Sequence, residues 1–138
     1  MEADNPMFDK KASTIPETSL PQEEQTLFDQ CKGEVMLFRL KGPLSFGAAK
    51  GITERMMLVR NYKVLILDIT DVPRLGVTAT LAIEDMVQEA KNNSRKAYVA
   101  SSSENVRDRL HRFGVEGVVT SRKEALEAAI LDLTSRDS

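Results

Sequence analysis

The chain has few of the residues on which metal and disulfide chemistry depends. Its 138 residues include no tryptophan, one cysteine (Cys31) and one histidine (His111). A single cysteine excludes an internal disulfide and a cysteine-based structural zinc site, and it fits a reducing, cytoplasmic setting. A single histidine provides no histidine cluster for a catalytic metal. We therefore expect neither a metal centre nor another cofactor.

Long apolar runs and an excess of positive charge are also absent. No apolar run approaches the ~18–20 residues needed to cross a bilayer, so we expect a water-soluble chain. The formal net charge is −2, which gives no overall positive field to attract phosphates. No aromatic residues are interleaved with basic ones to stack on bases. We expect no nucleic-acid partner.

Motifs of phosphate-binding and nucleophile loops are missing as well. The sequence contains no GxxxxGK[ST], no GxGxxG and no GxSxG. Asp68 and Asp71 follow an apolar run at the expected carboxyl end of a strand, where α/β proteins usually bind ligands. No base accompanies them, so we interpret Asp68 as a turn cap and Asp71 as a solvated side chain. We expect no enzymatic activity.

The charge is unevenly distributed along the chain. Residues 1–34 hold eight acidic residues, three lysines and three of the five prolines. The prolines interrupt any helix in this stretch, and its first part lacks apolar periodicity. We predict a flexible linker or tail over residues 1–26 and one folded domain over residues 27–138. Leu27 and Phe28 are expected to dock on that domain.

Strand and helix patterns alternate from residue 35 onward. Short apolar or β-branched runs predict strands at 35–40, 64–67, 96–100 and 118–119. Apolar residues at helical spacing predict helices at 47–60 and 77–92, one from the capping box Ser101-x-x-Glu104 to Phe113, and one after the capping box Ser121-x-x-Glu124. The alternation predicts an α/β layer fold with about four helices on a sheet of four or five strands.

Two motifs resemble those of STAS domains at the C-terminal end of SulP anion transporters. Residues 42–49 resemble the stretch Gly-Pro-Leu-x-Phe-x-x-Ala of that family. Residues 64–73 resemble its hydrophobic strand followed by Asp, an apolar residue, Ser or Thr, any residue and Val. The resemblance extends over about Val35 to Leu133. It implies the STAS fold with a mixed sheet, and a noncatalytic regulatory and dimerisation domain on the cytoplasmic side of the cell membrane.

Within the SulP family, residues 71–81 are most similar to cyanobacterial bicarbonate transporters. The resemblance implies sodium-dependent bicarbonate uptake, with a second copy of the chain and the transporter's own membrane domain as partners. The candidate partner contacts lie in the N-terminal segment with the first strand and in one loop: Leu27, Phe28, Val35, Leu37, Asp71, Pro73, Gly76 and Thr78. We favour the N-terminal segment, because edge strands with unpaired backbone groups readily pair.

The alternative is a free-standing protein of the second STAS class, the anti-sigma factor antagonists. Their loop reads Asp-Ser-Ser/Thr-Gly, and a partner kinase phosphorylates the serine after the aspartate. The matching positions here begin at Gly76, which has no carboxylate, and Val77, which has no hydroxyl to accept phosphate. We interpret Thr78 as a helix N-cap and Gly76 as a residue that allows positive φ or close backbone approach.

A basic run lies on the expected helix before Phe113. It consists of Arg107, Arg109, His111 and Arg112. Helical spacing places Arg109 and Arg112 on one exposed side. We interpret the run as a solvated face, with weak contact to anionic lipid headgroups as the second interpretation for a domain tethered below a membrane.

Overall fold

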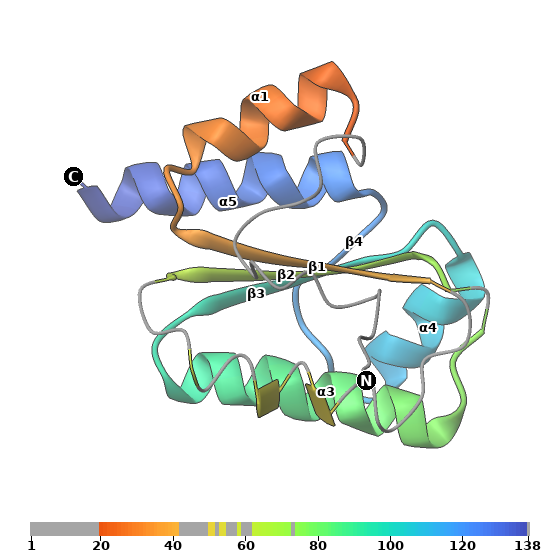
Figure 1. Ribbon diagram of the computed structural model, residues 1–138. Helices are drawn as coiled ribbons and strands as arrows, with labels where there is room; N and C mark the ends of the chain where they lie inside the picture. The colour runs from red at the N-terminus through yellow and green to blue at the C-terminus, as the bar shows by residue number, and fades with distance from the viewer. Residues whose placement is uncertain are drawn as a thin grey trace, which may run out of the picture.

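The expected alternation of strands and helices is confirmed. The computed structural model describes residues 20–41, 50–51, 53–54, 58, 62–72 and 74–137. Its elements are α1 (Gln22–Gln30), β1 (Val35–Lys41), β2 (Val64–Asp71), α3 (Val77–Asn92), β3 (Lys96–Ala100), α4 (Glu104–Arg112), β4 (Val118–Val119) and α5 (Arg122–Asp137). Figure 1 shows these elements stacked in three layers, with the sheet in the middle.

The described strands form one four-stranded sheet with the order β1-β2-β3-β4. All three pairings are parallel, so over the described residues the sheet is parallel where a mixed sheet was expected. The connections from β2 to β3 and from β3 to β4 each pass through a helix, which returns the chain to the same end of the sheet. Such crossovers produce parallel neighbours.

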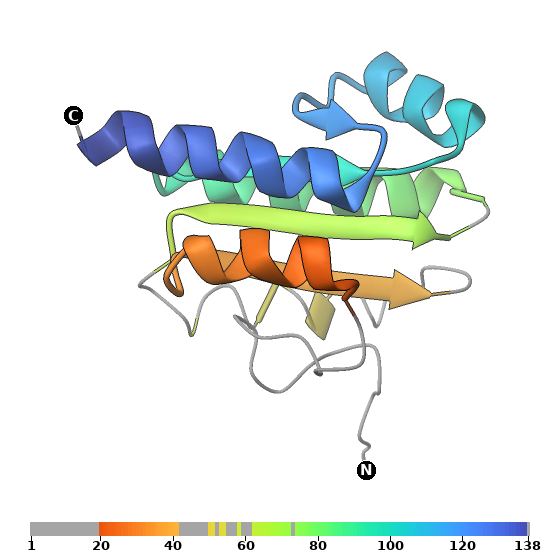
Figure 2. The same cartoon turned by 90° about the horizontal axis from the view of Figure 1, so that it is seen from above.

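Helices cover both faces of this sheet. Figures 1 and 2 show α1 and α5 on one face and α3 with α4 on the other. Along β2, Val64 and Ile66 belong to the core cluster beneath α1 and α5, whereas Leu65 and Leu67 belong to the cluster beneath α3 and α4. All four are fully buried, which confirms the expected central strand covered on both sides.

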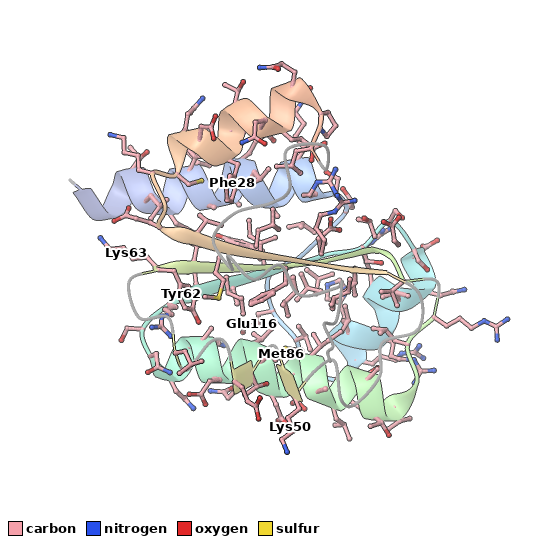
Figure 3. The ribbon with its side chains drawn as sticks, in the orientation of Figure 1. Phe28, Lys50, Tyr62, Lys63, Met86 and Glu116 are labelled. Atoms are coloured by element: carbon pink, nitrogen blue, oxygen red, sulfur yellow. The ribbon has the colours of Figure 1, made fainter. Side chains whose placement is uncertain are left out.

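Aromatic and sulfur-containing side chains mark the two core layers. Figure 3 shows Phe28 in the layer of α1 and α5 and Met86 on the opposite side of the sheet, beside α3. Phe28 is buried, and Leu27 packs against the same cluster. The expected docking of these two residues is therefore confirmed.

The folded part of the chain begins earlier than Leu27. Helix α1 starts at Gln22, with Pro21 at its N-cap, and Leu20 before it is buried. Proline is tolerated at the start of a helix, because the N–H that it lacks would have no helical partner there. Pro21 thus begins a helix that we had expected it to prevent. The rest of the expected tail, residues 1–19, lies outside the described residues.

One capping prediction is confirmed and one is wrong. Ser121 accepts a hydrogen bond from the Glu124 N–H at the start of α5, as expected. Helix α4, however, is capped by Ser103, whose Oγ accepts from the Val106 N–H, and Ser101 is fully buried before it. Three consecutive serines offer equivalent capping groups, and the path of the chain after β3 selects the last of them.

The segment between β1 and β2 is described only in part. Of the helix expected at 47–60, residues 50, 51, 53, 54 and 58 are described, and each is helical. The turn and extended piece expected at 41–46 lie outside the described residues after Lys41.

The Cys31 thiol should react only slowly in the native protein. Its side chain is 1% exposed, and burial together with the nearby Glu34 carboxylate raises its pKa to about 11. At pH 8 its thiolate population should be about 100-fold smaller than that of an unfolded cysteine. We expect labelling by a thiol-specific disulfide reagent to be slower by at least this factor in buffer than in urea. The native rate should rise with pH up to about 11, and a plateau near pH 9 would contradict this assignment.

Candidate functional site

A buried carboxylate lies at the carboxyl end of β2. Alternation along the strand places Asp68 on the same face as Val64 and Ile66, beneath α1 and α5, where it is 2% exposed. Its Oδ1 accepts hydrogen bonds from the Thr70 backbone N–H at 3.0 Å and from Thr70 Oγ1 at 2.7 Å. The residue therefore forms the turn-like contact expected from the sequence, but within a strand that continues to Asp71.

Two guanidinium groups neutralise this carboxylate. Arg122, the first residue of α5, donates from Nη1 to Asp68 Oδ2 at 2.8 Å. Arg39, which pairs with Asp68 in the register between β1 and β2, places its Nε at 3.5 Å from the same oxygen. Buried charges are tolerated when they are paired and hydrogen-bonded, and Asp68 meets both conditions.

The same network holds α1 on α5. Arg122 also donates from Nε to Glu24, and the adjacent Lys123 pairs with Glu23 at 2.6 Å. Burial disfavours the charged form of Arg122, but its hydrogen bonds to Glu24 and Asp68 outweigh that cost and raise the pKa of the guanidinium. A permanently cationic side chain thus joins β2, α1 and α5 at one end of the molecule.

Asp68 and His111 lie in different surroundings. His111 is exposed on α4, and Asp68 is fully engaged by Thr70 and arginines. Across the described ranges, no three His, Cys, Asp or Glu side chains come together as a metal site would require. Nor does any described helix have the length and apolar composition of a membrane span.

Comparison with protein families identifies the fold. The family model of the STAS domain matches residues 29–129, which is most of the chain. The chain is a STAS domain. The match begins within α1 and ends within α5, so it takes in the sheet and the whole ion-pair network except Glu23 and Glu24.

Two curated relatives share about a third of the residues of this STAS domain. The bicarbonate transporter BicA of a Synechocystis species is 34% identical over 128 residues, which are 88% of this chain and 23% of the relative. BicA of a Picosynechococcus species is 34% identical over 120 residues, 83% of this chain and 21% of the relative. The chain thus spans about a fifth of the length of these relatives.

Solved structures share the fold. A SulP transporter STAS domain from Vibrio cholerae superposes with a TM-score of 0.66 at 21% identity, covering 95% of this chain and 99% of that one. The murine anion transporter Solute Carrier 26 family member A9 superposes with a TM-score of 0.57 at 14% identity, covering 70% of this chain and 18% of that one. The expected STAS α/β fold is confirmed.

The STAS domain buries the N-terminal contact candidates. The side chains of Val35 and Leu37 are fully buried beneath α1 and α5, and Phe28 is buried with them. Leu27 is partly exposed. These side chains stabilise the domain itself, because α1 covers the face of β1 that a partner would otherwise reach.

The loop candidates lie at the carboxyl end of the sheet. Asp71 is 52% exposed and has its Oδ2 at 3.7 Å from Arg39 Nη2, so it is solvated as expected. Gly76 and Thr78 are both exposed at the start of α3. Pro73 lies outside the described residues. Of the described candidates, Asp71, Gly76 and Thr78 are therefore exposed, whereas the side chains of Phe28, Val35 and Leu37 are buried.

The roles assigned to Gly76 and Thr78 are wrong. Gly76 is itself the N-cap of α3, with φ −78°, and a Cβ built on it meets no atom within 4 Å. Neither positive φ nor close approach therefore requires glycine. Thr78 lies inside the helix, and the bonded hydroxyl is that of Thr80, which donates to the Gly76 carbonyl at 2.8 Å. The expected cap was wrong because the N-cap of α3 is Gly76, two residues before Thr78.

Sequence reasoning missed the ion-pair network around Asp68. Arg39 could have been found, because it continues the alternation of Val35 and Leu37 on the face that Asp68 also occupies. Arg122 and Glu24 are 54 residues after and 44 residues before Asp68, and no spacing in the chain relates them to it.

Proposed function

We propose that the chain is the noncatalytic regulatory and dimerisation domain of a SulP-type anion transporter on the cytoplasmic side of the cell membrane. The transporter would carry out sodium-dependent bicarbonate uptake. The observation that carries the proposal is the 34% identity to BicA over 88% of the chain. BicA is about four times longer than the matched segment. We therefore expect the main partner of this chain to be the membrane domain of the same transporter.

A domain exchange tests the proposal directly. The segment of Synechocystis BicA that aligns with this chain is replaced by residues 20–138, in cells that lack their own bicarbonate uptake. We expect labelled bicarbonate to accumulate in a sodium-dependent manner, and a BicA truncated before this segment to accumulate less. A chimera that reaches the membrane at normal levels but is no better than the truncated protein would overturn the proposal.

Dimerisation is the second part of the proposal, and the exposed residues favour the start of α3 as its surface. Asp71, Gly76 and Thr78 are exposed there, and the same helix exposes Val77 (54%) and Leu81 (44%) one turn apart. Apolar side chains that water would otherwise surround gain free energy when a partner covers them. The apolar side chains of β1, by contrast, are buried.

Sedimentation equilibrium at tens of micromolar tests the dimer and its surface together. We expect the isolated domain to self-associate and Leu81→Asp to weaken the association by at least tenfold. Leu131→Asp is the matched control, because Leu131 is an exposed leucine (69%) on α5, on the other face of the sheet. A domain that stays monomeric removes the dimerisation role, and equal weakening by both variants removes this surface.

A further inference from the structure

A hollow of about 440 Å³ opens between the loop before α3 and one side of α4. Both helices cover the same face of the sheet, so the hollow lies between two neighbouring elements of one layer (Figure 1). Its wall is formed by Arg74, Leu75, Asn105, Val106, Arg109 and Arg112. Three of these six residues are arginines and none is acidic.

The wall of the hollow is positively charged, whereas the whole chain has a formal net charge of −2. Some basic residues elsewhere are paired with carboxylates, as Lys63 is with Glu34 and Lys91 with Glu116. Within the described ranges, no ion pair includes Arg74, Arg109 or Arg112. Three like charges around one hollow repel one another, and an anion placed among them relieves that repulsion.

Two elements bring these side chains together. Asn105, Arg109 and Arg112 are spaced four and three residues apart, so they share one side of α4. Cations in the last turn of a helix also stabilise its dipole, which accounts for Arg109 and Arg112 without any ligand. That explanation does not extend to Arg74, which comes from a different segment, directly before α3.

The start of α3 adds to the positive potential. Arg74 and Leu75 directly precede Gly76, the N-cap, which supplies no side-chain acceptor. The first turn of α3 contains no acidic residue. The positive end of this helix dipole is therefore not compensated by a side chain of the turn, and it lies beside the hollow.

We propose that this hollow is a binding site for a phosphate monoester. Guanidinium groups bind phosphate oxygens through paired, charge-assisted hydrogen bonds, and three of them suit a dianion better than a monovalent anion. The hollow is several times larger than a phosphate group, and Leu75 and Val106 give its wall an apolar part. These features fit an organic group that carries the phosphate. The ester could be a soluble metabolite or the headgroup of a lipid such as phosphatidic acid.

Binding to the isolated domain tests this proposal independently of the transporter assignment. The soluble arm titrates inorganic phosphate and glycerol 3-phosphate while the backbone amide resonances are followed. The lipid arm measures co-sedimentation with phosphatidylcholine vesicles, with and without phosphatidic acid. We expect saturable binding, with the largest shifts at the hollow, and about tenfold weaker binding for Arg74→Gln and for Arg109→Gln. Binding of vesicles alone assigns the lipid source, and binding of the soluble probes assigns the metabolite.

Lys32→Gln is the matched control. Lys32 is exposed in the turn after α1, at the other end of the sheet, so this variant removes one positive charge without touching the hollow. Arg74 is exposed and without an ion pair among the described residues, so Arg74→Gln should leave the free energy of unfolding unchanged. No saturable binding in either arm overturns the proposal. Equal loss in Lys32→Gln overturns it as well, because net charge alone then explains the attraction.

Discussion

Replacing Asp68 by asparagine should lower the free energy of unfolding by about 3 kcal/mol, because it leaves guanidinium groups at a nearly dry site without their anion. Asp68 is 2% exposed, and the Arg122 side chain that donates to it is 14% exposed. The amide keeps the shape of the carboxylate, so the loss reports charge and hydrogen bonding rather than a cavity. Urea denaturation at pH 7 measures the difference.

Asp71→Asn is the control for this experiment. It makes the same chemical change three residues further along the chain, where the side chain is 52% exposed, and should cost less than about 0.5 kcal/mol. Because buried pairs are poorly screened, the effect at Asp68 should persist in high salt. Arg122→Gln combined with Asp68→Asn should cost less than the sum of the single changes. Equal costs at Asp68 and Asp71 would show that the network contributes nothing to stability.

Replacing Gly117 by alanine should be still more disruptive, with an expected loss of about 3–5 kcal/mol from overpacking and backbone strain combined. Gly117 has φ +79°, and a Cβ built on it lies 2.2 Å from the Ala97 carbonyl oxygen. The obstacle is backbone of β3, which cannot rotate away as a side chain would. The strand pairing between β3 and β4 must therefore move, and the Gly117 carbonyl that accepts from the Val99 N–H moves with it.

Substitutions at two other glycines distinguish the cost of backbone strain from the cost of the steric clash. Gly114 has φ +82° but no atom within 4 Å of a built Cβ, so Gly114→Ala should cost about 1 kcal/mol through the backbone alone. Gly76 has negative φ and open space, so Gly76→Ser should be neutral or stabilise α3 by adding a capping hydroxyl. Thermal unfolding of the three variants measures this order. If Gly117→Ala lowers the melting temperature no more than Gly114→Ala does, then β4 can shift away from β3 without a loss of stability, and the prediction is wrong.

The periodicity of the chain predicted most of its elements because the core is organised by local patterns. The continuous β-branched and apolar run from Val64 to Leu67 favoured a strand covered on both faces, and the spacing of apolar residues placed α3 at its observed bounds, Val77–Asn92. Boundaries were less predictable. Pro21 reads as a helix breaker in a charged segment, yet a helix begins directly after it because α5 offers a surface for Phe28.

The candidate site was less accessible to sequence reasoning. Asp71, Gly76 and Thr78 were correctly placed at the carboxyl end of the sheet, but the roles of Gly76 and Thr78 were wrong, since capping depends on where the first helical turn begins. Arg109 and Arg112 were recognised as sharing one side of a helix. Their partner in the hollow, Arg74, could not be, because it approaches from a separate segment.

The sequence by itself determined the class of fold, the STAS resemblance and the lack of an internal disulfide, because these follow from composition and from patterns within about ten residues. The tertiary structure alone decided which charges meet. Asp68, Arg122 and Glu24 come from β2, α5 and α1, and their pairing depends on how three layers stack at one end of the sheet. Electrostatic contacts of this kind are set by distance in space, and separation along the chain carries no information about it.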